Sequence, residues 1–587
     1  MKPILRVLIV GGYGTFGGRL VQLLENEPRL TLIVAGRSLA KSRAWCAART
    51  NARATLIAAA FDREGDLEQQ LGSLNADLLV DASGPFQQYG AQPYRLIQAC
   101  ITHRISYLDL ADGSDFVAAV KQFDVAAREA GIFILSGVSS FPVLTAAVVR
   151  RLSTGFATVD SIRGGIAPSP YAGVGDNVIR AIASYAGQPI RLRREGAQVT
   201  AYPFTESVRY TVAPPGRVPL RPLRFSLVDV PDLRALADLW PEAKTIWMGA
   251  GPVPALLHRA LTLFAWLVRA RLIPSLLPLV PLISFVMNHV RWGEHRGGMF
   301  VEVVGTNARG ASVKRSWHLI AEADDGPLIP SMALEAIIRR LLNGKPPVSG
   351  ARAAVCDLEV EDYEAIFADR RIFTGVRYDD DARSAVLYAR VLKSAWRVLP
   401  PEIQQLHSVE SSFAALGRCS VERGKSLFAR FIAWIFGFPE EGSGVDLQVR
   451  FEVRDGVEVW TRTFADRSFS STQSEGRGRS EHLLCERFGP FSFAIALLPK
   501  HTRMDLVLRG WTAFGIPMPL WLGPWSNSYE YADDRRFRFD VQIGHPVAGL
   551  IVRYRGWLMP TTTLPAYTSD LSSASVPAHE TASASGS

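Results

Sequence analysis

A glycine-rich turn between a buried strand and a helix is the feature that most constrains the fold of this chain. Residues 7–20 read VLIVGGYGTFGGRL. Residues 4–10 are mostly apolar and branched, as in a strand that is buried on both faces of a parallel sheet. Leucine and valine recur at helical spacing between residues 20 and 24. A strand, a G-x-G-x-x-G turn and a helix, in this order, predict the first unit of a dinucleotide-binding fold.

The glycines of this turn have separate predicted roles. Gly12 permits the tight turn, Gly14 lets a pyrophosphate approach the backbone, and Gly17 lets the helix and the strand pack closely. The free amides and the positive dipole at the helix N-terminus then hold the phosphates. The residues that we predict to bind the cofactor are Gly12, Gly14, Thr15, Phe16, Gly17, Arg37, Ser38, Asp62, Ser83, Gly84 and Pro85.

The end of the next strand indicates which dinucleotide is bound. Residues 30–35 form the predicted strand, and Gly36-Arg37-Ser38 follow it. An acid at this position hydrogen-bonds the ribose 2′-hydroxyl of NAD. A guanidinium instead suits a 2′-phosphate, because its planar fork donates two parallel charge-assisted hydrogen bonds. We therefore predict NADP(H), the alternative being that Arg37 is a surface arginine at a strand end.

The alternation of strands and helices continues to about residue 150. Further strands are predicted at 55–61, 77–81, 107–110 and 132–135, with helices at 66–74, 93–103 and 116–131. This spacing predicts a Rossmann-type, doubly wound parallel sheet in a domain of residues 1–150. Ligands of such sheets bind at the carboxyl ends of the strands. Asp62 is expected near the adenine, and Ser83 and Gly84 near the nicotinamide half.

Five stretches of this region carry a resemblance to a known family. They are GGYGTFGGRL, AGRS, VDASGPFQQYG, YLDLADGSDF and LSGVSSFP. In this order they resemble the NADP-binding domain of the saccharopine dehydrogenase-like family, and the resemblance continues to about residue 375. It implies an NADP-dependent oxidoreductase with a small-molecule substrate, and a middle α+β domain at 151–375 that binds substrate and forms a homodimer.

One segment departs from the family pattern. Saccharopine reductases carry L-D-P-G after the last strand of the nucleotide domain, and its acid is thought to serve the amino-acid substrate. This chain has Ser139-Ser140-Phe141-Pro142 there, so a saccharopine-like substrate is not predicted. The chain also lacks Tyr-x-x-x-Lys, H-E-x-x-H, G-x-S-x-G and clustered Cys and His. We therefore predict neither a metal site nor a serine hydrolase.

Three residues near the expected nicotinamide are candidate catalytic acids: Tyr89, Asp109 and Asp112. The alternative for each is a loop residue that satisfies local backbone groups. Glu294-His295-Arg296 offers a histidine that could titrate near neutral pH, or a salt-bridged turn.

An apolar segment at 252–290 interrupts the middle domain. Its first half contains His258 and three arginines, and its second half contains three prolines, so neither half is a good membrane span. We expect two buried helices that cap the substrate cleft or form a subunit interface. The alternative is a hairpin that dips into a membrane surface. Strands are predicted at 297–307 and 312–323, joined by a turn at Asn307–Gly310.

The C-terminal part has the alternating pattern of half-exposed antiparallel strands. In VDLQVRFEV, residues 445–453, apolar and polar residues alternate strictly. Five similar stretches follow, so we predict a β-rich domain at 380–559, a strongly bent sheet or barrel of six or more strands. The region from about 388 to 558 resembles a bacterial domain of unknown function. Residues 560–587 are predicted to be a disordered tail.

Net charge, cysteine content and the N-terminal residues bear on which functions and locations we expect. The net charge of +9 is spread along the chain without basic blocks, so nucleic-acid binding is not predicted. The five cysteines lie far apart and indicate reduced thiols, and the N-terminus shows no secretory signal, so a cytoplasmic location is expected, with membrane association left open. The alternatives to an oxidoreductase are an inactive NADP-binding sensor and a peripheral membrane or lipid-handling protein.

Overall fold

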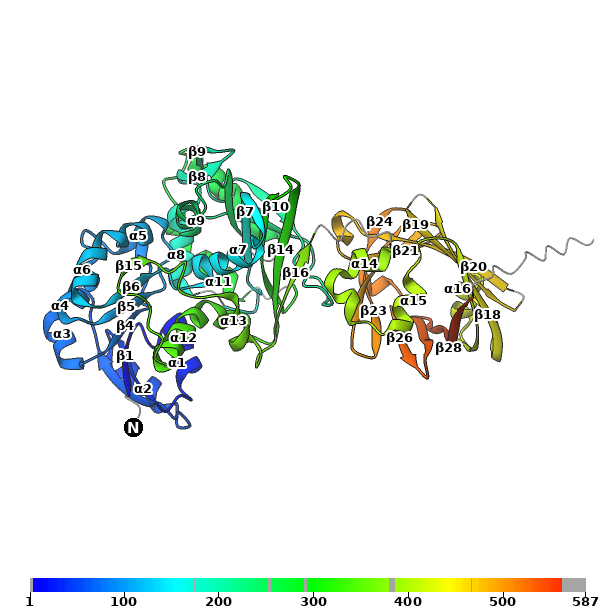
Figure 1. Cartoon of the computed structure of the whole chain (residues 1–587), viewed down its shortest axis with the longest axis horizontal. Coiled ribbons are helices and arrows are strands. Elements are labelled where there is room, and N and C mark those ends of the chain that lie inside the picture. The colour runs from blue at the N-terminus through cyan, green and yellow to red at the C-terminus, as the bar shows by residue number, and fades with distance from the viewer. Residues whose placement is uncertain are drawn as a thin grey trace, which may run out of the picture. The chain divides into compact units, whose positions relative to one another are not determined.

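The computed structural model describes residues 4–173, 175–251, 255–289, 293–378, 386–454, 456–465 and 467–561 (Figure 1). The chain forms two compact units, which are described in turn. The first contains the residues up to 399 together with 475–485 and 493–510, and the second contains 400–474, 486–492 and the residues from 511 onward. The predicted tail lies outside the described residues from 562 onward. Its first two residues, 560 and 561, belong instead to the last strand.

The first sheet is parallel throughout and has the strand order β15-β6-β5-β4-β1-β2-β3. Its strands are β1 (Leu5–Val10), β2 (Leu30–Gly36), β3 (Thr55–Ala60), β4 (Leu78–Asp81), β5 (Ser106–Asp109), β6 (Phe133–Ser136) and β15 (Gly350–Ala353). An order in which the chain starts in the middle and winds outward in both directions is that of the Rossmann fold. The predicted doubly wound parallel sheet is confirmed.

Both faces of this sheet are covered by helices, and β1 shows why the sequence requires this. Val7 and Ile9 belong to one apolar cluster, whereas Leu8 and Val10 belong to another on the opposite face. A strand with apolar side chains on both faces is stable only between two layers of helices. The helices of this part are α1 (Thr15–Leu24), α2 (Leu39–Ala47), α3 (Leu67–Leu74), α4 (Arg95–His103), α5 (Ser114–Ala119), α6 (Asp124–Ala130) and α7 (Thr145–Leu152).

The seventh strand, β15, comes from a distant part of the sequence. It pairs in parallel with β6, and α12 (Ile329–Leu342), just before it, packs beside α1. The hydroxyl of Ser331 on α12 donates to the carbonyl oxygen of Phe16 at 3.1 Å. The sequence analysis placed these residues in the middle domain, because β15 reads Gly-Ala-Arg-Ala and has no run of large apolar residues that would mark a buried strand. The chain therefore returns to the first sheet after forming most of the middle domain.

The middle part contains a mixed sheet of order β10-β11-β12-β7-β13-β14-β16. Its strands are β7 (Phe156–Ala167), β10 (Ser207–Tyr210), β11 (Leu223–Leu227), β12 (Thr245–Ala250), β13 (Gly297–Asn307), β14 (Ser312–Ala321) and β16 (Ile372–Tyr378). Strands β8 (Ile190–Arg194) and β9 (Ala197–Ala201) form a separate hairpin. The predicted hairpin β13–β14 is confirmed, and its turn is held by Asn307 Oδ1, which accepts from the backbone N–H groups of Arg309 and Ala311.

The apolar segment at 252–290 forms two helices within its described residues, α10 (Ala255–Arg269) and α11 (Val280–His289). On α10 only His258, Ala265 and Val268 are buried, so the expectation of buried helices holds for one side only. Within the described ranges, the helices are too short or too polar to cross a membrane. The remaining helices of the first unit are α8 (Asp176–Tyr185), α9 (Asp232–Leu239), α13 (Val360–Phe367) and α14 (Leu387–Leu392).

The C-terminal sheet is antiparallel and closes on itself, because β22 pairs with both β21 and β23. Its strands are β17 (Phe413–Arg423), β18 (Gly442–Arg454), β19 (Val457–Phe464), β20 (Arg467–Glu475), β21 (Leu484–Phe488), β22 (Phe491–Pro499), β23 (Arg503–Ala513), β24 (Ile516–Met518), β25 (Trp525–Ser526), β26 (Ser528–Asp533), β27 (Arg536–His545) and β28 (Gly549–Thr561). The predicted alternation holds on β18, where Leu447, Val449 and Phe451 are buried. Two helices accompany the strands, α15 (Pro401–His407) and α16 (Leu427–Ile435).

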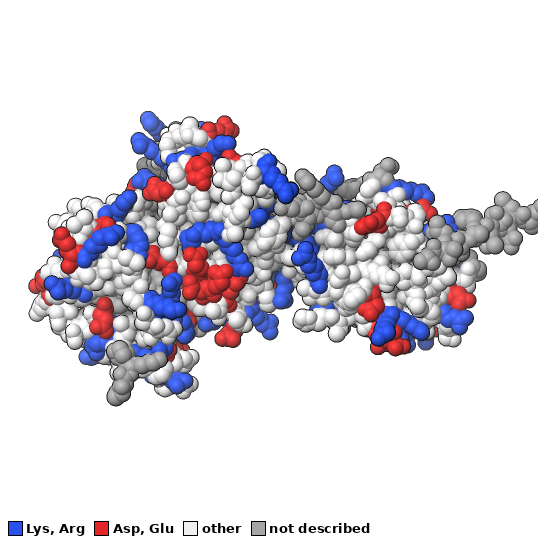
Figure 2. Space-filling model, in the orientation of Figure 1, with Lys and Arg blue, Asp and Glu red and all other residues white. Residues whose placement is uncertain are grey.

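Charged side chains of both signs are interspersed over the face of the molecule shown in Figure 2. Such mixing is the usual character of a solvated surface, whereas nucleic-acid-binding proteins gather cations on one face.

Candidate functional site

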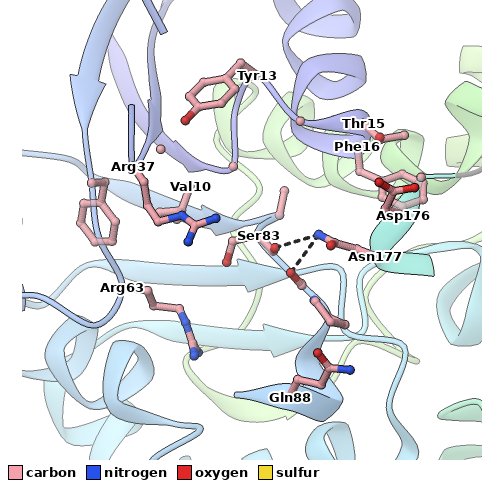
Figure 3. Close-up of a pocket in the computed structure, with 18 of the residues that line it drawn as sticks. Val10, Tyr13, Thr15, Phe16, Arg37, Arg63, Ser83, Gln88, Asp176 and Asn177 are labelled. Carbon is pink, nitrogen blue, oxygen red and sulfur yellow. Dashed lines mark hydrogen bonds between the residues drawn. The ribbon is translucent and has the colours of Figure 1, made fainter. Parts of the chain in front are cut away.

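A cavity of about 590 Å³ lies at the carboxyl ends of the parallel strands (Figure 3). Among the residues that line it are eight predicted for cofactor binding: Gly14, Thr15, Phe16, Arg37, Asp62, Ser83, Gly84 and Pro85. They come from the ends of β1, β2, β3 and β4 and from the first turn of α1. This is the crevice in which open α/β sheets bind their ligands.

The glycine turn has the close backbone packing that its sequence predicts. A Cβ atom on Gly17 would collide with the carbonyl oxygen of Gly11, and one on Gly12 would lie 2.8 Å from the carbonyl oxygen of Ile9. These two glycines therefore serve packing and do not line the cavity. Gly14 is exposed and lines it, so its missing side chain leaves backbone open to a ligand.

The N-terminus of α1 faces this cavity through Thr15 and Phe16. Within the described residues, no side chain caps this helix end, and the first turn holds no acid. The unpaired amides and the helix dipole therefore favour an anion here. These features fit a dinucleotide pyrophosphate.

Two residues after β2 have different roles in the structure. Arg37 is exposed and extends into the cavity (Figure 3). Ser38 does not line it: its hydroxyl caps α2 by accepting from the Lys41 N–H at 3.3 Å, and its own N–H donates to the Tyr13 hydroxyl. A direct contact of Ser38 with a cofactor stays a prediction.

Arg63 is a second cation in the same cavity, which sequence reasoning missed. It follows β3 and lines the cavity, and its side chain lies below that of Arg37 in Figure 3 and runs away from it. Its Nη1 atom is buried and has no hydrogen-bond partner among the described residues, while Nη2 donates to Glu64 Oε1 at 2.9 Å. The guanidinium lies 3.1 Å from the centre of the Tyr89 ring. Its position directly after a strand was the signal that could have identified it.

The loop after β4 is held from the middle part of the chain. Asn177, on α8, donates from Nδ2 to the carbonyl oxygens of Ser83 and Gly84 at 3.2 and 2.9 Å (Figure 3). Asn177 also lines the cavity. Nothing in the local sequence pattern links residue 177 to residue 83, so only the tertiary structure identifies this contact.

Tyr89 lines the cavity but is bound to buried groups. Its hydroxyl donates to Asp81 Oδ2 at 3.1 Å and lies 2.9 Å from Ser83 Oγ. Burial raises the pKa of the Tyr89 phenol, and the negative charge of Asp81 raises it further. A phenol with a raised pKa is a weaker proton donor near neutral pH, and these contacts make Tyr89 a support for the Ser83 loop.

Asp109 is fully buried and lines neither described cavity. Its Oδ1 accepts from the N–H groups of Ala111 and Gly137 at 2.9 and 2.7 Å, and Ser136 donates to Oδ2 at 2.8 Å. Burial raises the pKa of Asp109 to about 7, although these hydrogen bonds lower it. Its contacts are structural, since they join the end of β5 to the end of β6.

A second, mostly apolar cavity of about 300 Å³ adjoins the first. The two cavities share Phe16, Gly175 and Val178 as lining residues. Ser139, Ser140 and Phe141, which replace the acid-bearing segment of saccharopine reductases, line the second cavity. The position at which the family carries an acid is therefore part of an apolar wall here.

Asp112 is the one of the three predicted acids that lines the second cavity. Its Oδ1 accepts from Gln87 Nε2 at 2.9 Å. Burial raises the pKa of Asp112, against a lowering by the Gln87 hydrogen bond. A carboxyl group with a raised pKa beside an apolar cavity has the properties of a general acid.

His295 lines the second cavity as well. Its Nε2 lies 3.6 Å from Asp324 Oδ1, and its ring packs against Tyr171. The neighbouring Glu294 and Arg296 form an ion pair. The salt-bridged turn, one of the two alternatives that the sequence left open, is therefore present. The histidine of this turn nevertheless faces the cavity.

Comparison with solved structures finds similar chains over about two thirds of this one. A histidine-tagged saccharopine dehydrogenase (L-Glu forming) from Saccharomyces cerevisiae, in its apo form, is 12% identical, with a TM-score of 0.46, and the match covers 64% of this chain and 99% of that one. GenD2 from gentamicin A biosynthesis, in complex with NAD, is 15% identical, with a TM-score of 0.31 and coverages of 64% and 97%. A myo-inositol dehydrogenase from Corynebacterium glutamicum is 12% identical, with a TM-score of 0.31 and coverages of 63% and 98%. No curated protein matches this chain.

Two family models match separate parts of the sequence. Residues 7–135 match the saccharopine dehydrogenase NADP binding domain, and residues 399–558 match a domain of unknown function, DUF4166. The resemblances given by the sequence are thereby confirmed for these stretches. The chain thus carries a saccharopine dehydrogenase NADP-binding domain near its N-terminus and a DUF4166 domain in its C-terminal part.

Proposed function

We propose that this protein is an NADP(H)-dependent oxidoreductase whose substrate is an apolar small molecule. The observation that carries the proposal is the shared wall of the two cavities, made by Phe16, Gly175 and Val178. A dinucleotide that fills the first cavity reaches this wall, and a substrate in the second meets it there. The second cavity is lined mainly by apolar side chains, which favour an apolar substrate over an amino acid.

The first cavity supplies groups for each part of the cofactor. Gly14 and the first turn of α1 would bind the pyrophosphate, and Arg37 would bind the 2′-phosphate, while Arg63 adds a second positive charge to the same cavity. Bound NADPH supplies a hydride to a carbonyl, imine or activated alkene. Asn177 keeps the Ser83-Gly84 loop in place at the other end of the cavity.

Asp112 is the residue to which we assign proton transfer. The Gln87 amide holds its Oδ1, so Oδ2 is the atom that would carry the proton towards a substrate in the apolar cavity. The raised pKa increases the protonated fraction that is available near neutral pH. His295, just before β13, lines the same cavity and would orient the substrate.

Calorimetric titration with NADPH and NADH tests the cofactor assignment. We expect the wild-type chain to bind NADPH more tightly, and Arg37→Ala to lose roughly ten- to a hundredfold in NADPH affinity with little change for NADH. Arg43→Ala, an exposed arginine on α2 that lines neither described cavity, is the matched control and should bind both as wild type does. If neither dinucleotide binds the wild-type chain, the glycine turn is only an inherited element of the fold.

An assay of NADPH oxidation distinguishes an enzyme from an inactive NADP-binding sensor. With NADPH bound, we expect oxidation of NADPH in the presence of an apolar carbonyl or alkene and no oxidation with saccharopine. Asp112→Asn should reduce this turnover while leaving NADPH affinity unchanged, because Asp112 lies outside the first cavity. Tight NADPH binding without turnover across a broad apolar panel would favour the sensor.

The exposed side of α10 supports a second role for the segment 252–290. Leu256, Leu263 and Trp266 are exposed there, and an apolar helix side in a folded chain marks an interaction surface. Contact with a second copy and contact with a membrane surface are the two candidates. Leu256→Glu with Leu263→Glu would lower the molecular mass measured by ultracentrifugation in the first case and prevent vesicle flotation in the second.

A further inference from the structure

The C-terminal domain carries a separate apolar surface, which we call the tryptophan face. It consists of the outer side of α16 together with two loops, residues 514–527 and 544–550. The exposed large side chains of these segments are Leu427, Phe428, Phe431, Trp434, Ile435, Phe514, Ile516, Trp521, Leu522, Trp525 and Val547. All of them belong to the second compact unit.

Helix α16 is oriented with its small residues inward. Ala429 and Ala433 are its buried residues, while Leu427 is 83% exposed and Trp434 is 69% exposed. A helix in a water-soluble domain normally buries its large apolar side chains. The reversed arrangement leaves an apolar stripe that nothing within the described residues of this unit covers.

The three segments are neighbours in space. The Ser426 hydroxyl, at the start of α16, donates to the carbonyl oxygen of Ala548 at 2.8 Å, and Phe428 contacts His545 edge to face. His545 Nε2 lies 3.3 Å from the carbonyl oxygen of Leu522, and Trp525 pairs with Gly544 in the sheet. At the other end of α16, Phe436 contacts Phe491, which contacts Phe514. The exposed residues therefore form one continuous surface.

Two of the segments place apolar residues at the tips of turns. Phe514, in the turn between β23 and β24, is 79% exposed, and Val547, in the turn between β27 and β28, is 81% exposed. Turn tips normally carry polar residues. Protruding apolar tips are suited to penetrate a fluid layer, whereas a rigid protein partner would have to provide a matching pocket for each of them.

The charged residues of the tryptophan face indicate the chemistry of its partner. Acids make up 56 of the 587 residues, yet residues 424–439, 514–527 and 544–550 contain none. The cations in these segments are Lys425 and Arg430, both exposed. Tryptophan favours the boundary between headgroups and acyl chains, and cations beside an apolar face favour anionic lipids.

We infer that the tryptophan face docks on the surface of a membrane that contains anionic lipids. Trp434, Trp521 and Trp525 would lie at the headgroup boundary, and Lys425 and Arg430 would contact the lipid phosphates. This role goes beyond the proposed oxidoreductase activity and does not depend on it. It also uses a surface different from that of α10.

Flotation of the full chain with vesicles tests this inference. We expect it to float with vesicles of phosphatidylcholine mixed with phosphatidylglycerol, and to float less with phosphatidylcholine alone. Leu427→Glu with Trp434→Glu should weaken binding to the mixed vesicles by about tenfold or more, because two negative charges would enter the apolar layer. Lys425→Gln with Arg430→Gln should weaken it by roughly tenfold for the mixed vesicles only.

Two controls make the result decisive. Val125→Glu alters an equally exposed apolar residue, on α6 in the other unit, and should not change flotation. The variants on α16 should keep the wild-type far-UV circular dichroism spectrum and unfolding temperature, which shows that the unit that carries them is folded. Unchanged flotation of the α16 variant would overturn the inference, as would a fall in its molecular mass without a change in flotation, because the face would then join two copies.

Discussion

Replacing Gly17 by alanine should strongly weaken NADPH binding. The new methyl group would collide with the carbonyl oxygen of Gly11, so the turn or the first turn of α1 has to move. Backbone shifts of this kind cost about 3 kcal/mol, which corresponds to a loss of affinity of roughly a hundredfold or more. The loss should occur for NADH as well, since the turn binds the part that both dinucleotides share. Calorimetric titration with each dinucleotide measures the effect.

Gly18→Ala is the matched control for this prediction. Gly18 lies on the same helix one residue later, and its Cβ would meet only the Trp45 ring, at 3.3 Å. Alanine also stabilises a helix relative to glycine by about 1 kcal/mol. The control should therefore bind NADPH as the wild type does. Equal affinity of the Gly17 and Gly18 variants would mean that the close packing of the turn does not control cofactor binding.

The stability of the nucleotide-binding domain should fall as the pH rises from about 4 to about 7. Asp109 has a pKa of about 7 in the folded chain and an ordinary value of 3.8. A carboxyl group with a raised pKa binds its proton more tightly in the folded state than in the unfolded state. Its contribution to the free energy of unfolding is therefore complete below pH 3.8, and it is lost as the pH rises through the folded-state pKa of about 7. The full contribution of Asp109 to the change in unfolding free energy over this pH range is on the order of 4 kcal/mol.

Urea unfolding at pH 5 and pH 8 measures this contribution. Asp109→Asn cannot ionise, so the difference in unfolding free energy between the two pH values should shrink for this variant. Asp238→Asn, an exposed aspartate on α9, is the control and should keep the wild-type difference. An undiminished difference in the Asp109 variant would assign the pH dependence to other groups.

The sequence predicts those parts of the fold that are encoded locally. The glycine turn and the buried strand before it lie within 14 consecutive residues, and the alternation on β18 is strict, so both were identified. The short strand β15 was not, because its sequence, Gly-Ala-Arg-Ala, lacks the run of large apolar residues that marks β4, β5 and β6. Helix α16 carries large apolar residues, which helices of folded chains normally bury, and only the tertiary structure shows that they are exposed here.

The candidate site, too, was predicted from the sequence only in part. Arg37 follows from its position after β2, and the structure brings it into the cavity. Tyr89 and Asp109 were equally well placed in the sequence, yet their polar atoms are bound to buried groups. The sequence identifies the loop on which a residue lies, whereas tertiary packing decides whether its side chain faces the ligand or the core. Arg63 and Asn177 were missed for this reason.

The return of the chain to the first sheet affects how the protein is made. Because β15 pairs with β6, the nucleotide-binding sheet lacks one edge strand until residue 353 has left the ribosome, when more than half of the chain has been synthesised. Until then the edge of β6 is open to wrong pairing. The nascent chain therefore has to fold most of its middle domain before its first domain is finished, and a fragment of residues 1–150 should aggregate.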